Sequence, residues 1–336
     1  MTKNDKGFEK TYKSPKKEKQ RDINPFENTD SNKRYYTYDY YLRKKYGCKC
    51  AKITLDAGFS CPNIDGTVSC GGCIYCSGRG SGDFTFAPSL SISEQFENQK
   101  SIISKKWHNV KYIPYLQAHT NTYAPTDTLR RVYGEILSLP DTVGFNIATR
   151  ADCISDECLD LLSEVAEVTD LTVELGLQSI YDDTARLINR GHSYADFLRC
   201  YNRLREKNDK IGICVHIING LPGESCEMMI ETAKNVAFLR PEQIKIHLLY
   251  VLSGTPMERM YLDGQYEPMA LDEYVDTVVK QLEYIHKDTV IGRITGDAPE
   301  GELVAPLYSR KKLVVMNEID KALFARRTYQ GRLFRE

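Results

Sequence analysis

The sequence predicts an α/β protein whose main part is a partial (β/α)6 barrel of the TIM type, with a basic N-terminal extension and a C-terminal α/β extension. Two observations support this fold class. Short β-rich segments alternate with segments whose apolar residues recur at helical spacing, which is typical of right-handed parallel βα units. Six units fit between about residues 50 and 255, whereas the closed barrel has eight. The predicted strands are 52–55, 111–117, 143–148, 171–175, 211–218 and 244–250.

The segments between these strands have one apolar face each, as helices that cover a sheet do. Ser155 and Ser193 stand directly before two of the segments and are followed by acidic residues, so we expect both serines to be N-caps. The apolar positions are Leu129, Val132 and Ile136, then Leu159, Leu162 and Val165, then Phe197, Tyr201 and Leu204, and finally Met229, Ala233 and Val236.

Three regions follow from these patterns. Residues 1–32 have the polar composition of a disordered basic tail. Residues 33–255 form the predicted core, which includes a tyrosine-rich segment at its start. The spacing of apolar residues in 256–336 predicts an extension that covers part of the barrel, with a helix at 271–285, a strand at 290–294 and a helix at 311–327.

Charge is distributed unevenly along the 336 residues, although the formal net charge is only −1. Residues 10–52 contain thirteen Lys and Arg against five Asp and Glu, and residues 309–336 contain eight against three. The stretch between these basic ends is therefore acidic. A basic flank is either a solvated surface or the electrostatic footprint of a nucleic acid.

The hydropathy of the chain argues against membrane and secreted proteins. No run of 18 apolar residues occurs, and the first thirty residues lack an apolar stretch. We therefore expect a cytoplasmic protein with no membrane partner. Eleven cysteines, an odd number, in a reducing compartment favour metal, cluster or catalytic roles over disulfides.

Tyrosines and cations are interleaved in the segment 34–46, which reads RYYTYDYYLRKKY. Tyrosine rings offer stacking faces and the cations offer phosphate contacts, the combination that single-stranded RNA binders use. Helix tyrosines packed on a neighbouring core would give the same pattern, and the two interpretations are compatible. The candidate nucleic-acid contacts are Arg34, Arg43, Lys44 and Lys45.

Four cysteines lie in one loop directly after the first predicted strand, within DAGFSCPNIDGTVSCGGCIYC. Cys70, Cys73 and Cys76 form two overlapping C-x-x-C pairs, and Cys61 precedes them. Thiolates at this spacing bind zinc or an iron–sulfur cluster. Because the carboxyl ends of barrel strands form the active-site face, this position favours a catalytic centre over a structural zinc site. A second C-x-C pair, Cys48 and Cys50, has no visible partners for a metal.

The cysteine loop resembles that of radical S-adenosylmethionine (SAM) enzymes, and the long interval from Cys61 to Cys73 is similar to the Elp3-like branch. Further motifs narrow the resemblance to the YhcC/YtqA (MnmL-like) family across nearly the whole chain after residue 33. The motifs are YYTYDYYLRKKYG, LDAGFSCPNIDGT, GGCIYC, YLQAHTNTYAP, TVELGLQS, NRGHS, INGLPGE and RITGDAPEGELVAPLYS.

The resemblance implies a [4Fe–4S] cluster held by Cys61, Cys73 and Cys76, with Cys70 as an extra cysteine. One iron of such a cluster stays open, and the amino and carboxylate groups of SAM bind it. Reduction then splits SAM and gives a 5′-deoxyadenosyl radical, which takes a hydrogen atom from the substrate. Cys70 leaves a second ligand choice open, in which it replaces Cys73. The resemblance favours the first choice, in which the C-x-x-C pair of Cys73 and Cys76 has an aromatic residue, Tyr75, directly before its last ligand. The resemblance puts Tyr75 against the adenine.

The resemblance also implies SAM contacts at other strand ends. Thr120 and Asn121 stand where relatives have a Gly-rich turn that holds the methionyl amino group, and this sequence lacks those glycines. Arg190 is similar to the arginine that pairs with the SAM carboxylate, a role that suits its forked guanidinium. Thr149, Gln178 and His216 also end strands at the same face. The alternative for each residue is a polar side chain that closes a βα loop.

The family resemblance implies a reaction at the wobble uridine of tRNA, which converts a carboxymethylaminomethyl side chain at position 34 to aminomethyl. The basic ends agree with a tRNA partner whose flipped base enters the barrel. An electron donor such as flavodoxin or ferredoxin is also implied. Two alternatives stay open: a radical SAM enzyme acting on a small metabolite or a protein, and a non-catalytic iron–sulfur or zinc protein that binds RNA or transfers electrons.

Overall fold

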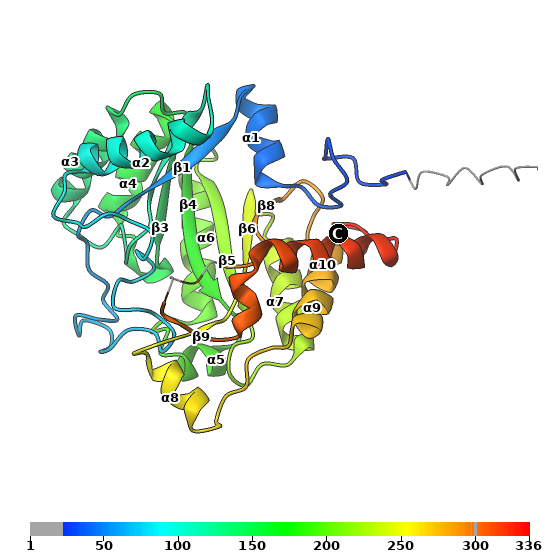
Figure 1. The fold of residues 1–336 in the computed structure, drawn as a ribbon. Helices are drawn as coiled ribbons and strands as arrows, with labels where there is room; N and C mark the ends of the chain where they lie inside the picture. Colours follow the sequence, from blue (N-terminus) through cyan, green and yellow to red (C-terminus); the bar gives the residue numbers. More distant parts are fainter. Residues whose placement is uncertain (1–22, 297, 299–300) are drawn as a thin grey trace, which may run out of the picture.

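Seven parallel strands form one curled sheet in the order β1-β2-β3-β4-β5-β6-β8 (Figure 1). The computed structural model describes residues 23–296, 298 and 301–336. All six predicted strands are present, which confirms the partial barrel. β8, which belongs to the C-terminal extension, adds a seventh strand, so the sheet is wider than residues 33–255 alone would make it. The strands are β1 (Cys50–Leu55), β2 (Lys111–Leu116), β3 (Phe145–Thr149), β4 (Leu171–Gln178), β5 (Gly212–Asn219), β6 (Gln243–Leu248) and β8 (Val290–Arg293).

Helices cover the convex face of this sheet (Figure 1). Both serine N-caps are confirmed: the Ser155 side chain accepts a hydrogen bond from Cys158 N, and the Ser193 side chain accepts one from Asp196 N. Each cap satisfies a helix N–H that has no partner within the helix. The helices that lie between β1 and β6 in the chain are α2 (Ile92–Lys106), α3 (Thr126–Leu137), α4 (Asp156–Val168), α5 (Asp182–Leu187), α6 (Tyr194–Lys207) and α7 (Cys226–Phe238), with a short 3-10 turn η1 (Ala151–Cys153) before α4.

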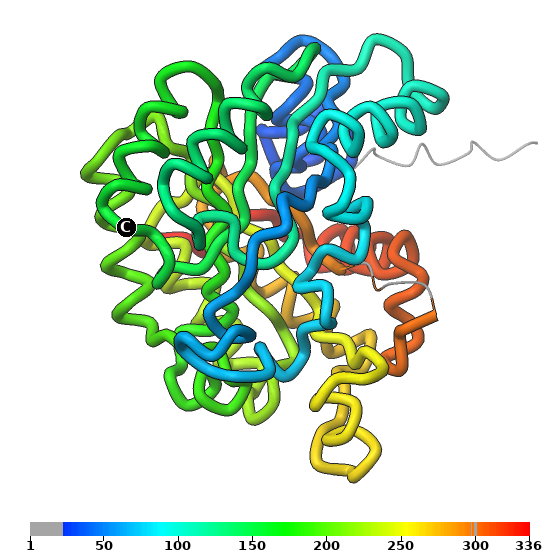
Figure 2. The backbone as a smooth tube through the Cα atoms, turned by 90° about the vertical axis from the view of Figure 1, so that its left-hand side faces the viewer, coloured from blue at the N-terminus to red at the C-terminus, as the bar shows by residue number. Residues whose placement is uncertain are grey.

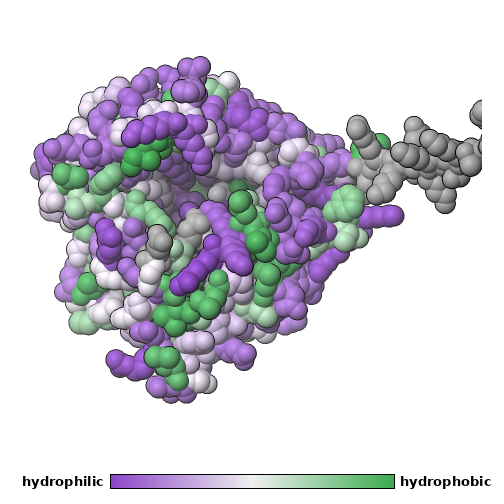
Figure 3. Space-filling view, in the orientation of Figure 1, coloured by the Kyte–Doolittle hydropathy of each residue, from purple (hydrophilic) through white to green (hydrophobic). Residues whose placement is uncertain are grey.

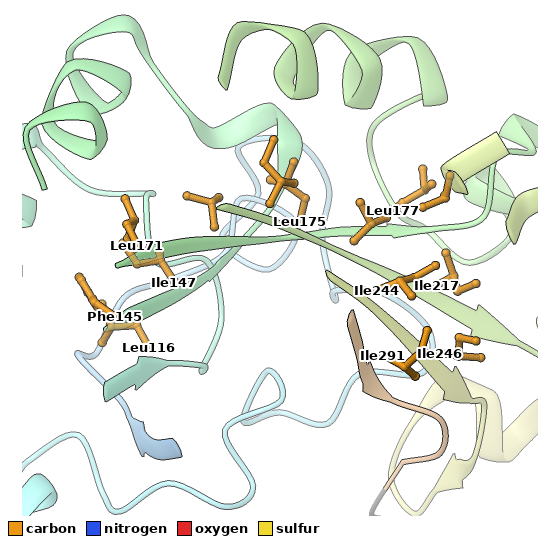
Figure 4. Packing of buried hydrophobic residues seen from close by; sticks show 14 of the residues in the cluster. Leu116, Phe145, Ile147, Leu171, Leu175, Leu177, Ile217, Ile244, Ile246 and Ile291 are labelled. Atoms are coloured by element: carbon orange, nitrogen blue, oxygen red, sulfur yellow. The ribbon is translucent and has the colours of Figure 1, made fainter. Parts of the chain in front are cut away.

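The main hydrophobic core lies between the sheet and these helices. Strand side chains alternate between the two faces of a sheet, so every second residue of a strand points outward. Figure 4 shows such outward-facing residues on several strands, among them Leu175, Ile217 and Ile246, which are fully buried or nearly so. The other set of alternate residues faces the inside of the barrel, and these residues include Glu174 and Lys245.

The C-terminal extension is joined to the core sheet. β8 pairs in parallel with β6, with Gln243 opposite Val290, and β7 (Val251–Leu252) pairs antiparallel with β9 (Leu303–Ala305). α10 packs on α9, which packs on α7. The extension therefore adds one strand to the barrel wall and packs its helices beside α7. Its helices are α8 (Pro256–Leu262), α9 (Leu271–Tyr284) and α10 (Lys312–Ala325), with a 3-10 turn η2 (Leu307–Arg310).

The predicted disordered tail, residues 1–32, falls only partly within the described residues, since residues 1–22 lie outside them. Residues 23–32 do not fit that prediction. Phe26 is 5% exposed and packs with Tyr36 and Val290, and the Asn28 amide donates to the Lys287 carbonyl and to Asp288. The apolar Phe26 ring provides the burial that orders this segment.

Helix α1 (Tyr38–Tyr46) covers the amino-terminal ends of the strands. Tyr46 Oη donates to Asp170 (2.6 Å), and the Lys45 ammonium lies 2.9 Å from the same carboxylate, which directly precedes β4. The long loop after β1 lies at the other end of the strands, and Figure 2 shows it at the bottom with α1 at the top. No described helix is long and apolar enough to cross a membrane.

Candidate active site

A cavity opens at the carboxyl ends of the parallel strands, and the face of the molecule drawn in Figure 3 is hollowed near its centre. The loop after β1, the ends of β2 to β6, and β8 all contribute to its wall. Polar groups gather there because strand ends and βα loops meet at one edge of a parallel sheet. The residues predicted from sequence that line the cavity are Cys61, Cys73, Tyr75, Cys76, Thr120, Thr149, Gln178, Arg190 and His216.

The cysteine loop is held in place by the segment before α6. The Asn189 amide donates to the Gly72 carbonyl (2.7 Å) and to the Cys70 carbonyl (3.2 Å), and Ile74 N donates to the Ile188 carbonyl. Gly71 and Gly72 both have positive φ, which side chains rarely tolerate. This conformation turns Cys73 into the protein, where it is 5% exposed.

Cys73 lies in an environment that stabilises a thiolate. A hydrogen bond from Cys76, together with the positive charges of Arg190 and Arg150, lowers the pKa of the Cys73 thiol to about 5 against the opposing effect of burial. The Asn63 amide donates to Cys73 Sγ at 3.6 Å, and Arg190 Nη1 lies 4.0 Å away. Thiolates are the form of cysteine that binds iron and zinc.

Cys70 stands apart from the other three cysteines. It is exposed and does not line the cavity, whereas Cys61, Cys73 and Cys76 do. The three cysteines that line the cavity are thus the three that the resemblance assigns to the cluster.

Arg190 is buried beside the cysteine loop, with 6% of its surface exposed. Its Nη2 donates to the Gly176 carbonyl at 2.6 Å. The Nε atom of Arg190, Oγ1 of Thr120 and Nδ1 of His119 are buried polar atoms without a hydrogen-bond partner among the described residues, and all three side chains line the cavity. A buried polar atom left unpaired costs about 1–3 kcal/mol. These atoms therefore fit a polar ligand such as SAM.

The remaining predicted SAM contacts differ in how they face the cavity. The Asn121 amide donates to the Leu116 and Ala148 carbonyls, and Asn121 does not line the cavity, so the structure does not support it as a SAM contact. The Thr122 hydroxyl donates its proton to the Cys153 carbonyl, so in its hydrogen bond with Thr149 it is the acceptor. Thr149 lines the cavity, but its hydroxyl proton is therefore used by Thr122. The Thr149 oxygen is thus left as an acceptor only.

Gln178 and Tyr75 both line the cavity. Gln178 has a φ of 73° and lies at an irregular register between β4 and β5. A positive φ at glutamine is uncommon, and such backbone strain concentrates at functional positions. Tyr75 packs against the smaller core cluster that contains Leu249 and Met257, and burial raises the pKa of its phenol well above the usual value. Its ring is therefore held in one place as a neutral apolar surface.

His216 belongs to a group of inward-facing residues around Glu174 that the sequence analysis did not single out. We name this group, which consists of Lys52, Asn146, Glu174, His216 and Lys245, the Glu174 network. Glu174 accepts from Lys52 (2.7 Å) and Asn146 (2.8 Å) on Oε1, and from Lys245 and His216 (2.8 Å) on Oε2. His216 is thus tied to Glu174, although it lines the cavity.

Burial and charge set the protonation states of this network. Burial would raise the pKa of Glu174, but Lys245, Lys52 and His216 hold it well below the usual value. Burial lowers the pKa of His216 to about 4, with Lys245 adding to the effect, so the imidazole is neutral at pH 7. Burial likewise lowers the pKa of Lys245, to about 8, and the attraction of Glu174 only partly offsets it.

The nucleic-acid candidates lie away from this cavity. Arg34 is 4% exposed and its guanidinium stacks on the Phe324 ring, so it is not available to RNA in this conformation. Arg43 pairs with Asp30 (2.6 Å) and Asp39 (2.9 Å), and Lys45 pairs with Asp170. Lys44 is exposed, with no ion pair among the described residues.

The tyrosines of segment 34–46 are largely packing residues. Tyr36, Tyr38 and Tyr41 contribute to two small clusters that also contain Val290 and Ile113. Because α1 covers the amino-terminal ends of the strands, its cations do not form a rim around the cavity mouth. The core-packing interpretation of this segment is confirmed, and the RNA interpretation, which is compatible with it, stays a prediction.

Comparison with known proteins agrees with this architecture. Residues 69–236 match the model of the radical SAM superfamily, and residues 241–325 match the radical SAM C-terminal domain. The chain belongs to the radical SAM superfamily. It is 47% identical to YtqA of Bacillus subtilis over 311 residues, covering 93% of this chain and 96% of that protein. It is 34% identical to YhcC of Escherichia coli K12 over 283 residues, covering 84% and 90%.

More distant similarity leads to the Elp3-like branch. The chain is 29% identical over 166 residues to the tRNA uridine(34) acetyltransferase of Methanocaldococcus infernus, which covers 48% of this chain and 30% of that protein. The solved structure of Elp3 from the same organism superimposes with a TM-score of 0.59 at 19% identity, covering 81% of this chain and 63% of that one. The structural superposition establishes that this chain and Elp3 share a fold.

Radical SAM proteins bind a [4Fe–4S] cluster and SAM, and these are the cofactors of this chain. The cavity residues fit both groups. Cys61, Cys73 and Cys76 place three thiols at the cavity wall, and the buried, unpaired polar atoms of Arg190 and Thr120 fit a polar ligand. Five further residues that were not predicted as site residues line the same cavity: Glu174, Lys245, His247, Tyr250 and Arg293.

Proposed function

We propose that this radical SAM enzyme acts on the wobble uridine of tRNA and converts its carboxymethylaminomethyl side chain to aminomethyl. The observation that carries the proposal is the combination of a cluster-type cysteine loop facing the barrel cavity with the extended similarity to tRNA uridine(34) enzymes. When bound, the cluster and SAM supply a 5′-deoxyadenosyl radical that abstracts a hydrogen atom. An electron donor such as flavodoxin or ferredoxin primes the reaction.

The chemistry that fits this substrate starts at the methylene group between the amine and the carboxylate. Loss of a hydrogen atom there, followed by loss of one electron, leaves an iminium ion. Water hydrolyses it to the aminomethyl product and glyoxylate. The one electron released equals the one electron used to cleave SAM, so the cycle balances with SAM, substrate and water alone.

The protein would assist by holding the reacting groups and admitting the base. Arg190 and Thr120 bind SAM next to the cysteine loop. Phe84 lines the cavity and keeps 50% of its surface exposed, which suits a ring on which an extruded base stacks. Base–aromatic stacking contributes about 1–3 kcal/mol, so Phe84→Ala is expected to weaken tRNA binding.

The deciding experiment uses chain reconstituted with iron and sulfide, SAM and dithionite, together with tRNA from cells that lack the gene. We expect 5′-deoxyadenosine, aminomethyl uridine and glyoxylate in equal amounts by mass spectrometry. The Cys73→Ala variant serves as the control that forms none of the three. Release of 5′-deoxyadenosine with an unchanged tRNA nucleoside profile would exclude tRNA as the substrate and favour a small metabolite or a protein.

A further inference from the structure

Two lysines share the single carboxylate of Glu174, and one of them faces the cavity. Lys245 on β6 is the register partner of His216 on β5 and of Arg293 on β8, and all three side chains line the cavity. We propose that Lys245, with His247 and Arg293 beside it, binds a carboxylate group of the substrate. This inference rests on the proposed function, because it takes the cavity as the place where the substrate reacts.

Glu174 has no capacity left for a further donor. Each of its oxygens already accepts two hydrogen bonds, from Lys52 and Asn146 on one side and from Lys245 and His216 on the other. Its side chain is fully buried. One carboxylate thus stands against two ammonium groups, since His216 is neutral at pH 7. Buried charges without full compensation are costly, and a second anion would relieve that cost.

The two lysines differ in what surrounds them. Both lysines lie over the Tyr115 ring, Lys52 at 4.8 Å and Lys245 at 4.7 Å, but Lys52 also lies over Tyr38, at 4.8 Å, and does not line the cavity. Lys245 lines it, and an ammonium has three N–H donors. One donor is used by Glu174, and a second lies at the long distance of 3.5 Å from Tyr115 Oη. Lys245 therefore has donor capacity for a ligand in the cavity, whereas Lys52, although its side chain is the more exposed of the two (19% against 8%), does not face the cavity.

His247 provides an independent observation at the same place. It lies two residues after Lys245 on β6, and its ring centroid is 5.1 Å from that of His216. Its Nε2 is buried and has no hydrogen-bond partner among the described residues, and the ring lines the cavity. Burial holds the pKa of His247 well below the usual value, so the neutral ring offers one N–H donor.

A metal ion is disfavoured at this position, although Glu174, Cys214 and His216 place their ligand atoms within 4.8 Å of one another. Burial raises the pKa of the Cys214 thiol to about 12, so it is not a thiolate. Lys52 and Lys245 already bind both Glu174 oxygens and would repel a cation. The same charges attract an anion. A substrate carboxylate next to an amine, as in the carboxymethylaminomethyl group, has the required chemistry.

The first experiment tests the anion site without tRNA. Lysine acetylation by acetic anhydride is measured by peptide mass spectrometry on the full chain, in the presence of propionate or propionamide, which share a shape and differ in charge. We expect propionate to slow the acetylation of Lys245 severalfold, while propionamide has no effect and Lys52 is unchanged. Equal rates at Lys245 with both compounds would overturn the proposal, whatever the substrate of the enzyme is.

The second experiment uses matched variants. Lys245→Met and Lys52→Met each leave Glu174 with one lysine, but only the first removes an ammonium that lines the cavity. Wild type is expected to bind tRNA bearing carboxymethylaminomethyl uridine roughly tenfold more tightly than tRNA bearing the aminomethyl product. The preference is expected to vanish in Lys245→Met, to persist in Lys52→Met, and to return in Lys245→Arg.

The dissociation constant of SAM separates the remaining explanations. We expect it to be the same in Lys245→Met as in wild type. A weaker SAM complex in that variant would show that the site holds the carboxylate of SAM and would overturn the proposal. If wild type shows no preference between the two tRNAs while propionate still protects Lys245, the anion site stands and the proposed tRNA function fails.

Discussion

Replacing Gly176 by alanine tests whether the position of Arg190 controls the binding of SAM. A Cβ atom at residue 176 would lie 2.7 Å from Arg190 Nη2 and 2.7 Å from Gln178 Nε2. The end of Gln178 can rotate away, but Arg190 is buried and bonded to the Gly176 carbonyl itself. Since comfortable contacts between heavy atoms begin at about 3.5 Å, the guanidinium would have to move by about 0.8 Å.

The displacement has two measurable costs. Overpacking of this kind destabilises a fold by about 1–3 kcal/mol. Loss of the charge-assisted hydrogen bonds from Arg190 to the SAM carboxylate would remove about 1.5–3 kcal/mol, which corresponds to roughly 10- to 150-fold weaker SAM binding. We therefore expect Gly176→Ala to fold with a lower melting temperature and to bind SAM weakly.

The assay is equilibrium dialysis of SAM against reconstituted chain, with thermal unfolding measured on the same preparations. Gly134→Ala is the matched control, because a Cβ there meets nothing within 4 Å on helix α3. That change is expected to leave SAM binding unaltered and to stabilise the fold by about 0.5–1 kcal/mol. Wild-type affinity in Gly176→Ala together with weak binding in Arg190→Ala would refute the positioning argument. Wild-type affinity for SAM in both Gly176→Ala and Arg190→Ala would refute the assignment of Arg190 as a SAM contact.

Three further outcomes are expected. Cys70→Ala should retain the visible absorbance and iron content of the cluster while Cys73→Ala loses them, and the reverse result would show that Cys70 is the ligand. Glu174→Gln should lower the free energy of unfolding by about 3–5 kcal/mol in denaturant titrations, because Lys52 and Lys245 lose their shared partner. The pKa of Glu174 is held below its ordinary value of 4.5, so its stabilisation is present above that pH and is lost on acidification. The wild type should therefore lose more stability below pH 4.5 than Glu174→Gln, in which only the other carboxylates titrate. If Glu174→Gln lowers the free energy of unfolding by less than about 1 kcal/mol, the Glu174 network is not a structural element. The preference for tRNA bearing carboxymethylaminomethyl uridine over tRNA bearing the aminomethyl product should fall as the pH rises through about 8, where Lys245 loses its proton. A preference that is constant up to pH 10 would contradict the role of the Lys245 ammonium.

Several features of the protein could be predicted from the sequence because they depend on local patterns. Alternating β-rich and amphipathic segments identified the six core strands, and Ser155 and Ser193 identified two helix starts. The cysteine loop identified the place of the cluster, since a loop that follows a barrel strand must lie at the carboxyl face. The separation of Cys70 from the other three cysteines also agrees with the predicted ligand choice, which the Cys70→Ala experiment tests.

The tertiary structure decided what depends on contacts between distant segments. The Glu174 network draws its members from five strands, and nothing within any one strand marks Glu174 or Lys245 as partners. The end of the barrel that α1 covers is set by Tyr46 and Lys45 meeting Asp170, which is more than a hundred residues away. Sequence alone thus determined the cofactor loop and the type of fold, because these are encoded in local spacing. Only the tertiary structure decided the charge balance inside the barrel and the end of the barrel that the basic helix α1 covers. Both depend on pairs of residues that are far apart in the sequence and that only folding brings together.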